Sequence, residues 1–374
     1  MRIGVITIVL NENYGGILQA YALQRILKEM GHDVTLIDRR RGFHMSFWAK
    51  CKSYTKRFML KYLLGRNISV RTDVKIKKDI QAISTYTRPF IDKHIHRTFT
   101  QDFTNIKLGD FDALIVGSDQ IWRAPASRPQ LYNVYLDFAK EWDVKRIAYA
   151  ASFGTEEWEY TDAETKVCKK LVEKFDSISV REISGVNLCK KKFNRDAVFV
   201  LDPTMLINRE MYTELFKEAK TPQSDGDLFC YILDSNEQKD ALINSVAKKK
   251  KYKPFFINSR YQDETAPIEE RIQPPVENWL RAFYDAKFVI TDSFHACVFS
   301  IIYNKPFIVY KNEERGNARF DSLLKTFGLE NRSFTNHKDL GALVDKEIDW
   351  EKVNNTYAVL KEKSYKYLAS ALDI

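Results

Sequence analysis

Short apolar runs alternate with amphipathic helical segments along both halves of the chain, and this alternation most restricts its fold. Apolar residues spaced three and four apart after such a run predict a helix that follows a strand. The first unit is a strand at 2–9, a helix whose apolar face ends at Gly31, and a strand at 34–37. Repeated alternation of this kind is typical of parallel sheets covered by helices. We therefore predict an α/β protein with two Rossmann-like, doubly wound domains that face each other across a cleft.

The same pattern sets the expected domain boundaries. At 374 residues the chain exceeds the usual size of one hydrophobic core and suits two domains. Further strands of the first domain, residues 1–205, are expected at 113–116, 147–150, 177–180 and 198–201. The second domain, residues 206–345, follows a polar stretch, with strands expected at 228–233, 254–257, 288–291 and 306–310. Residues 346–374 carry a C-terminal helical pattern that can pack on either domain.

One stretch of the first domain, the basic insertion at residues 39–72, differs in composition from the rest. It lies between Asp38 and Asp73 and holds no acidic residue, in a chain whose net charge is +9. Its basic residues are Arg39, Arg40, Arg41, Lys50, Lys52, Lys56, Arg57, Lys61, Arg66 and Arg71. Aromatic and aliphatic residues are interleaved with them, as in segments that lie on anionic membranes. The alternatives are a solvated insertion, a membrane contact or a nucleic-acid contact. No nucleic-acid-binding motif supports the last, so we expect no nucleic-acid partner.

Targeting and redox features favour the cytoplasm. The chain enters its first strand without a signal segment and has no apolar run near the ~20 residues of a membrane helix. Its five cysteines are widely spaced and form no CxxC pair, which indicates reduced thiols and no zinc site. We expect a cytoplasmic protein without a bound metal or cofactor. If the basic insertion contacts lipid, the protein is peripheral at the inner face of the membrane.

Polar residues and glycines follow several predicted strands of the first domain at their carboxyl ends, where open α/β sheets bind ligands. Glycine allows close approach of the backbone to a ligand, a helix N-terminus favours an anion, and arginine offers a two-pronged cation. The candidate residues are Asn13, Tyr14, Gly15, Gln19, Ser118, Asp119, Gln120, Trp122, Ser152, Phe153 and Arg181. Local sequence leaves alternatives open: a tight turn without ligand at residues 13–16, a core position for Trp122 instead of stacking on a sugar, and a surface ion pair for Arg181.

The second domain contributes His295, within Thr291-Asp292-Ser293-Phe294-His295, between a predicted strand and a predicted helix. The N–H groups at such a helix start favour an anion. Taken alone, the motif also fits a histidine that caps the helix or fills the core. We treat Ser293, Phe294 and His295 as candidate site residues.

Six segments, in this order, resemble the polysaccharide pyruvyl transferase family. They are residues 13–23 (NYGGILQAYAL), 116–122 (VGSDQIW), 147–154 (IAYAASFG), 179–182 (SVRE), 201–204 (LDPT) and 291–295 (TDSFH). The resemblance covers about residues 3 to 328. It implies two Rossmann-like domains arranged as in GT-B glycosyltransferases. It also implies transfer of pyruvate from phosphoenolpyruvate to two hydroxyls of a sugar, in a surface polysaccharide or its lipid-linked precursor, as a cyclic ketal.

Under this resemblance, His295 and Arg181 are the expected catalytic residues. Arg181 and a second arginine would hold the donor's carboxylate and phosphate. His295, made cationic by the doubly charged anion beside it, would act as general acid or stabilise the departing phosphate. Better-studied members carry an arginine two residues before the histidine, where this chain has Ser293. Arg315 and Arg319 are the nearest replacements in sequence.

Two other functions stay open at this stage. The same two-domain cleft also fits a glycosyltransferase that uses a nucleotide-sugar, or a non-catalytic sugar-binding protein. Phosphate release that requires phosphoenolpyruvate would select the pyruvyl transferase, and nucleotide release would select the glycosyltransferase.

Overall fold

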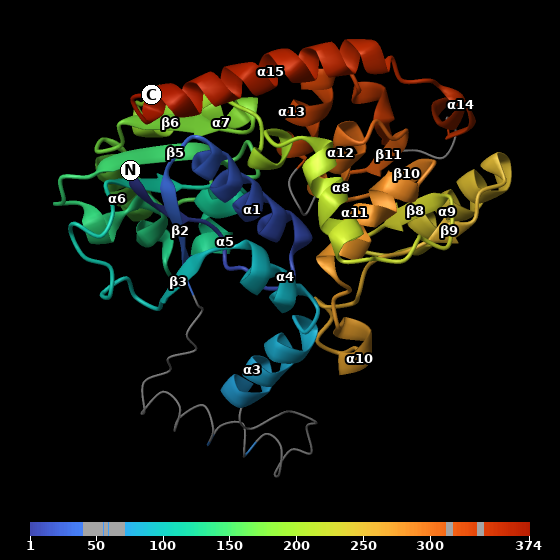
Figure 1. The fold of residues 1–374 in the computed structure, drawn as a ribbon, viewed down its shortest axis with the longest axis horizontal. Coiled ribbons are helices and arrows are strands. Elements are labelled where there is room, and N and C mark those ends of the chain that lie inside the picture. Colours follow the sequence, from blue (N-terminus) through green and yellow to red (C-terminus); the bar gives the residue numbers. More distant parts are fainter. Residues whose placement is uncertain (40–54, 56–58, 60–71, 312–316, 335–339) are drawn as a thin grey trace.

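The computed structural model describes residues 1–39, 55, 59, 72–311, 317–334 and 340–374. Within these residues the chain forms two parallel sheets, each with helices packed against it (Figure 1). The predicted α/β fold of two doubly wound domains is therefore confirmed. Most of the basic insertion lies outside the described residues.

The first domain is built on a seven-stranded sheet with the order β3-β2-β1-β4-β5-β6-β7. Its strands are β1 (Arg2–Ile6), β2 (Asp33–Arg39), β3 (Arg97–Thr100), β4 (Ala113–Val116), β5 (Lys145–Ala151), β6 (Ser177–Val180) and β7 (Val198–Phe199). All neighbouring pairs run parallel. The strand order reverses between β1 and β4, which is the position where such sheets leave a crevice for a ligand.

The second domain is built on a five-stranded parallel sheet with the order β12-β11-β10-β8-β9. Its strands are β8 (Leu228–Tyr231), β9 (Pro254–Phe255), β10 (Phe288–Thr291), β11 (Phe307–Tyr310) and β12 (Ser333–Phe334). Here the order reverses between β8 and β10, so His295, just after β10, follows a strand at the second crevice.

Helices cover both sheets. In the first domain they are α1 (Tyr14–Glu29), α3 (Thr72–Ile83), α4 (Thr87–His94), α5 (Ala124–Ser127), α6 (Asp162–Val172) and α7 (Ile183–Leu188). They continue with α8 (Arg209–Glu218), α9 (Glu237–Lys250), α10 (Ile268–Arg271), α11 (Val276–Asp285), α12 (Phe294–Ile302), α13 (Ala318–Phe327), α14 (Leu340–Asp345) and α15 (Trp350–Ala371). Within the described residues, no helix is both long and apolar enough to cross a membrane.

The C-terminal helix α15 lies across both domains (Figure 1). Tyr367 Oη donates to the carbonyl of Ala148 in β5, at 3.3 Å, and the Ser364 hydroxyl accepts from the amide of Leu201 at 2.9 Å. Toward its other end, Tyr357 packs edge-on against Phe327 of α13. The helix therefore ties the second domain back to the first.

Each strand predicted after residue 100 overlaps an observed strand. Three of them, β4, β6 and β10, have the predicted bounds to the residue. Two short strands, β3 and β12, were not predicted. Each lies at an edge of its sheet and is only partly buried, so neither carries the continuous apolar run of a central strand.

Candidate functional site

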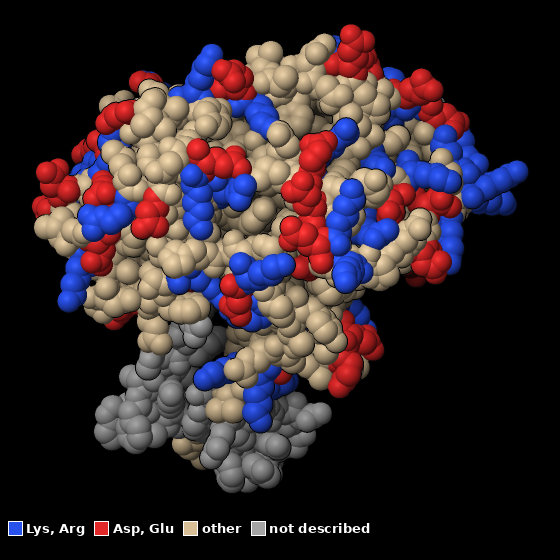
Figure 2. Space-filling model, in the orientation of Figure 1, with Lys and Arg blue, Asp and Glu red and all other residues tan. Residues whose placement is uncertain are grey.

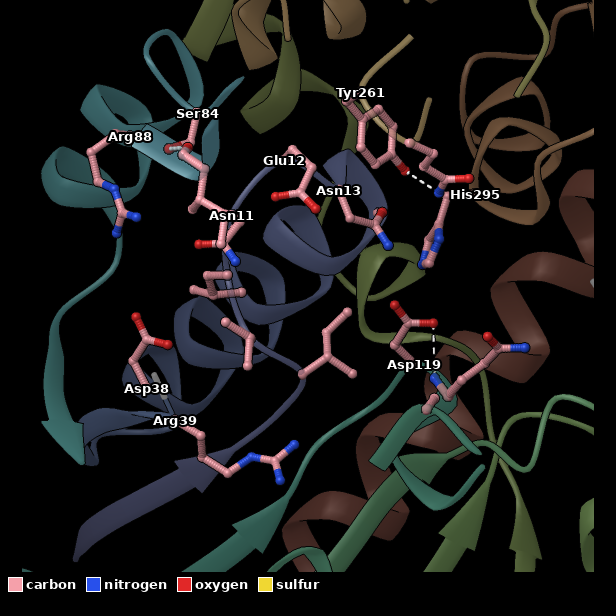
Figure 3. Close-up of a pocket in the computed structure, with 18 of the residues that line it drawn as sticks. Asn11, Glu12, Asn13, Asp38, Arg39, Ser84, Arg88, Asp119, Tyr261 and His295 are labelled. Carbon is pink, nitrogen blue, oxygen red and sulfur yellow. Dashed lines mark hydrogen bonds between the residues drawn. The ribbon is translucent and has the colours of Figure 1, made fainter. Parts of the chain in front are cut away.

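A cleft of about 2170 Å³ lies between the carboxyl ends of the two sheets. The loops that follow β1 and β4 line it from the first domain, and the turn after β10 lines it from the second. In the close-up, the amide of Asn13 and the carboxylate of Asp119 point toward the space beside His295 (Figure 3). The two sheet crevices thus open into one shared cavity.

Helix α1 begins at this cavity. The side chain of Asn13 accepts a hydrogen bond from the amide of Gly16 at 3.2 Å and so caps the helix. Gly15, in the first turn, packs directly against the ring of His295, and a Cβ at this position would overlap the imidazole. Glycine is needed at position 15 because a residue from the other domain occupies the space of its side chain.

We expect Gly15→Ala to reduce activity strongly while the protein still folds. The added methyl must push His295 out of place or open the domains, since it cannot coexist with Nδ1 and Cγ where they lie. A shift of about 1 Å at a catalytic group can cost on the order of 100-fold in rate. Steady-state kinetics with circular dichroism as a folding check measures this, and Gly341→Ala, in helix α14 away from the cleft lining, controls for loss of a glycine because the added methyl meets only the end of the Lys249 side chain. Parent-like turnover in Gly15→Ala would show that this contact is unimportant.

The turn that carries His295 is fixed by a buried ion pair. Lys239 Nζ lies 2.7 Å from Asp292 Oδ2, and both side chains are almost fully buried. The other Asp292 oxygen accepts from the amide of Leu233 at 2.7 Å, which joins the ends of β10 and β8. Ser293 is the N-cap residue of α12, but its side chain makes no capping hydrogen bond. Its short side chain therefore leaves the helix start open to the cleft.

A second buried network joins three segments of the first domain. Arg181 donates from Nη2 to Asp119 Oδ1 at 2.9 Å and from Nη1 to Asp202 Oδ2 at 2.6 Å. Ser118 Oγ donates to Asp202 Oδ2 at 2.9 Å, and the Thr204 hydroxyl donates to Oδ1 at 2.7 Å. These bonds bring the ends of β4 and β6 against residue 202, at the junction with the second domain.

His295 completes this network from the second domain. Its Nε2 lies 3.7 Å from Asp202 Oδ2, close enough for a charged pair when the ring is protonated. Burial alone raises the pKa of Asp202, but the adjacent imidazole and the Arg181 guanidinium hold that pKa far below its usual range. Burial likewise opposes ionisation of Asp119, but the charges of Arg181, His295 and Arg319 together outweigh it, so the pKa of Asp119 is lowered too. Both carboxylates are fixed anions at neutral pH.

Arg319, from α13, is a second buried arginine at the cleft wall. Its guanidinium lies 5.4 Å from the centre of the Phe294 ring, and Arg181 lies 4.6 Å from the same ring. Burial and the nearby charge of Arg181 lower the pKa of Arg319 to about 10, which still leaves it charged at neutral pH. Unlike Arg181, Arg319 lines the cavity together with Ser293.

The structure changes the expected role of Arg181. Its side chain is 1% exposed, and both terminal nitrogens are engaged by carboxylates. The expectation that Arg181 reaches into the cleft and holds an anion directly is therefore wrong. It was also expected, as an alternative, to form a surface ion pair, but the pair it forms is buried.

Three aromatic and polar candidates belong to the core of the first domain. Trp122 is fully buried, stacks on Tyr135 at 5.1 Å and donates from Nε1 to the carbonyl of Val134. It therefore does not stack on a ligand. Phe153 packs against Trp122, and the Ser152 hydroxyl accepts from the amide of Gly154 in the next turn. These side chains shape the loops of the cleft and do not line it.

Tyr14, Gln19 and Ser118 are likewise buried and do not line the cleft. Tyr14 donates to the carbonyl of Pro274 at 2.8 Å and so bridges the domains, while Gln19 bonds the carbonyl of Gly16 within α1. Of the remaining candidates, Arg315 lies outside the described residues. Those that the structure brings together around the cavity are Asn13, Gly15, Asp119, Gln120, Ser293, Phe294, His295 and Arg319.

Asp202 and Lys239 were not predicted as site residues. Asp202 follows the predicted strand at 198–201, so the rule that selected the other strand ends would also have selected it. Lys239 sits inside a polar helix, and nothing in its neighbourhood marks it as buried. Among the described residues, no group of three or more His, Cys, Asp or Glu is placed to hold a metal ion.

The sequence model for polysaccharide pyruvyl transferases matches residues 13–314. The chain belongs to this family. A search of curated proteins finds no match. Among solved structures, a glycotransferase of kitacinnamycin matches with a TM-score of 0.52 and 11% identity, over 99% of each chain. A UDP-GlcNAc 2-epimerase from Neisseria meningitidis matches with a TM-score of 0.49 and 9% identity, over 100% of this chain and 99% of the other. At such identities the likeness concerns the fold alone, and this pyruvyl transferase family member has the GT-B arrangement.

Proposed function

We propose that the protein transfers pyruvate from phosphoenolpyruvate to two hydroxyls of a sugar in a surface polysaccharide or its lipid-linked precursor, forming a cyclic ketal. The family supports a transferase that acts on polysaccharide. The observation that carries the donor assignment is the meeting of two helix starts, α1 and α12, at His295 and Gly15. Two sets of N–H groups beside a histidine and Arg319 favour a small, highly charged anion.

The chemistry has three needs: the donor must be held, its methylene carbon must be protonated, and phosphate must leave. In this proposal Arg319 and the two helix starts hold the donor's anionic groups. His295 supplies the proton to the methylene carbon or stabilises the departing phosphate. Asp202 Oδ2 lies 3.7 Å from His295 Nε2 and holds the imidazole in position.

Phosphate release tests the donor directly. The purified protein is incubated with phosphoenolpyruvate and a panel of oligosaccharides, and inorganic phosphate is measured with and without acceptor. We expect release that needs both substrates, with a mass gain in the sugar that matches a pyruvate ketal. Release of nucleoside diphosphate from a nucleotide-sugar instead would identify a glycosyltransferase, and neither activity would favour a sugar-binding protein.

Arg319→Ala should raise the KM for phosphoenolpyruvate about 10-fold or more, because a charge-assisted contact to the donor is lost. Ser293→Arg in that background should recover part of the loss, since residue 293 lines the same cavity. Lys325→Ala, at the far end of the same helix, is the control. A lower kcat with an unchanged donor KM in Arg319→Ala would show that Arg319 does not bind the donor and instead contacts the acceptor or stabilises the fold.

Membrane attachment is a separate part of the proposal and depends on the sequence of the basic insertion. Arg39 ends β2, is 5% exposed and lines the cleft, so it is not available to a membrane. On the face in Figure 2, positive and negative side chains alternate over the described parts of both domains. The insertion is the candidate for such a contact because its sequence holds ten basic residues and no acidic one.

We expect the protein to co-sediment with phosphatidylserine-containing vesicles at low salt and to be released as salt rises. Each Lys or Arg near an anionic bilayer contributes about 1 kcal/mol, and salt shortens the range of this attraction. Replacement of Arg40, Arg41, Lys56 and Arg57 by Ser should weaken binding, whereas neutralising Lys248, Lys249, Lys250 and Lys251 should not. Failure to bind such vesicles at low salt would leave the insertion as a solvated segment.

A further inference from the structure

The proposed transfer needs a base that the cleft residues described so far do not supply. Each of the two acceptor hydroxyls loses a proton, and only one of these protons ends on the methyl carbon. Asp119 and Asp202 are poorly placed to accept one, because both are buried and bound by Arg181. The acceptor ring also needs a surface on which to pack.

Glu12 is a carboxylate at the cleft itself. It lies in the loop between β1 and α1, directly before the helix cap Asn13, and its side chain is partly exposed and lines the cavity. The loop is held firmly, because the carbonyl of Asn11 accepts from the Thr87 hydroxyl at 2.6 Å and that of Glu12 accepts from Gln273 Nε2 at 3.1 Å. Figure 3 shows the Glu12 carboxylate beside Asn13, on the side of the cavity away from the first-domain sheet.

Tyr261 faces this loop from the second domain. It lies in the segment after β9, lines the cavity, and is partly exposed (Figure 3). Its hydroxyl accepts from Gln262 Nε2 at 2.8 Å, and its carbonyl accepts from Arg271 Nη2 at 3.4 Å. Arg271 in turn pairs with Asp79 of α3 in the first domain, at 3.0 Å. The segment that carries the ring is therefore linked through Arg271 to the first domain.

We infer that Glu12 and Tyr261 form the subsite for the acceptor sugar, an inference that rests on the proposed function for its chemistry. The aromatic ring packs on the apolar C–H face of a pyranose, which directs the sugar hydroxyls toward His295. Glu12 is the base that receives the proton of the attacking hydroxyl.

The two steps balance with these groups. In the first, the hydroxyl oxygen bonds to C2 of phosphoenolpyruvate as Glu12 takes its proton, and the C2–C3 π electron pair takes a proton from the His295 imidazolium. In the second, the other hydroxyl oxygen bonds to C2 and gives its proton to the now neutral His295. The C2–O bond to phosphate breaks with its electron pair, and the departing phosphate takes the proton from Glu12.

Binding of simple sugars tests the Tyr261 part. Saturation-transfer NMR is recorded for methyl β-D-galactoside, methyl α-D-mannoside and methyl N-acetyl-β-D-glucosaminide with the full-length protein. We expect transfer to the ring protons of at least one glycoside, lost in Tyr261→Ala and kept in Tyr261→Phe. Tyr365→Ala, an exposed tyrosine on α15, is the control. No transfer with the parent, or equal transfer with Tyr261→Ala, would overturn the subsite.

Kinetics test the Glu12 part. With the glycoside that binds and with phosphoenolpyruvate, Glu12→Gln should lower kcat about 100-fold, the scale of a lost general base, and change the donor KM by less than about twofold. Glu269→Gln, an exposed glutamate on α10, should match the parent. A parent-like kcat in Glu12→Gln would remove Glu12 from the reaction.

The outcomes of these experiments separate the sugar subsite from the pyruvyl transfer. If the parent binds a glycoside through Tyr261 but releases no phosphate from phosphoenolpyruvate, the pyruvyl transfer and the base role of Glu12 are wrong and the sugar subsite stands. If phosphate is released and both variants behave as the parent, the transfer stands and the subsite is wrong.

Discussion

Replacing His295 with alanine is expected to lower phosphate release from phosphoenolpyruvate by about 100-fold or more, the scale of a lost positioned acid. Three groups fix this ring: the Gly15 backbone that it touches, Asp202 at 3.7 Å, and the α12 start on which it sits. Each reaches it from a different segment. A histidine that only filled the core would not need a carboxylate and an open cavity beside it.

The kinetic comparison should include His96→Ala, since His96 is exposed and lies outside the main cleft. Its turnover should equal that of the parent. Circular dichroism and a thermal melt show whether His295→Ala is folded. A folded His295→Ala protein with near-normal turnover would remove His295 from the mechanism.

The fold was predictable because its central strands are buried on both faces. Runs such as Ala113–Val116 and Phe288–Thr291 are apolar at every position or nearly so, which separates them from the helices around them. The positions of Asn13, Asp119 and His295 at one cavity followed from the same pattern, because parallel strands end at a common edge. The sequence therefore predicted at which edge of the sheet each loop lies.

The direction of each side chain did not follow from the sequence. Trp122 and Asp119 lie in the same loop, yet one enters the core and the other the cleft wall. The partners of Arg181 are 62 and 21 residues away in the chain, and no local pattern reveals such pairs. Glu12 and Tyr261 come from different domains, so their common cavity depends on how the domains pack.

Arg181→Met is expected to destabilise the folded protein by roughly 3–5 kcal/mol, because it leaves buried carboxylates without their cation. The carboxylates of Asp119 and Asp202 have exposed fractions of 6% and 2%, so water cannot replace the lost contacts. The free energy of unfolding of Arg181→Lys should lie between those of the parent and of Arg181→Met, because one ammonium cannot reproduce the two-pronged bond. Urea unfolding at pH 7 measures the loss, and Arg128→Met, which breaks a partly exposed pair with Glu164, should cost at most about 1 kcal/mol.

The dependence on pH distinguishes this cause from a simple loss of packing. The pKa values of both carboxylates are lowered in the folded protein. The stabilisation that they receive is therefore complete above the unfolded-state pKa of about 3.9 and is lost as pH falls through the folded-state values.

In Arg181→Met the unpaired carboxylates take up protons more readily, which relieves their penalty in acid. The difference in unfolding free energy between parent and variant should consequently narrow from pH 7 toward pH 4, and Asp202→Asn in the Arg181→Met background should recover part of it at pH 7. A difference that stays constant with pH, or no recovery in the double variant, would mean that Arg181 stabilises the fold through packing and not through its charge.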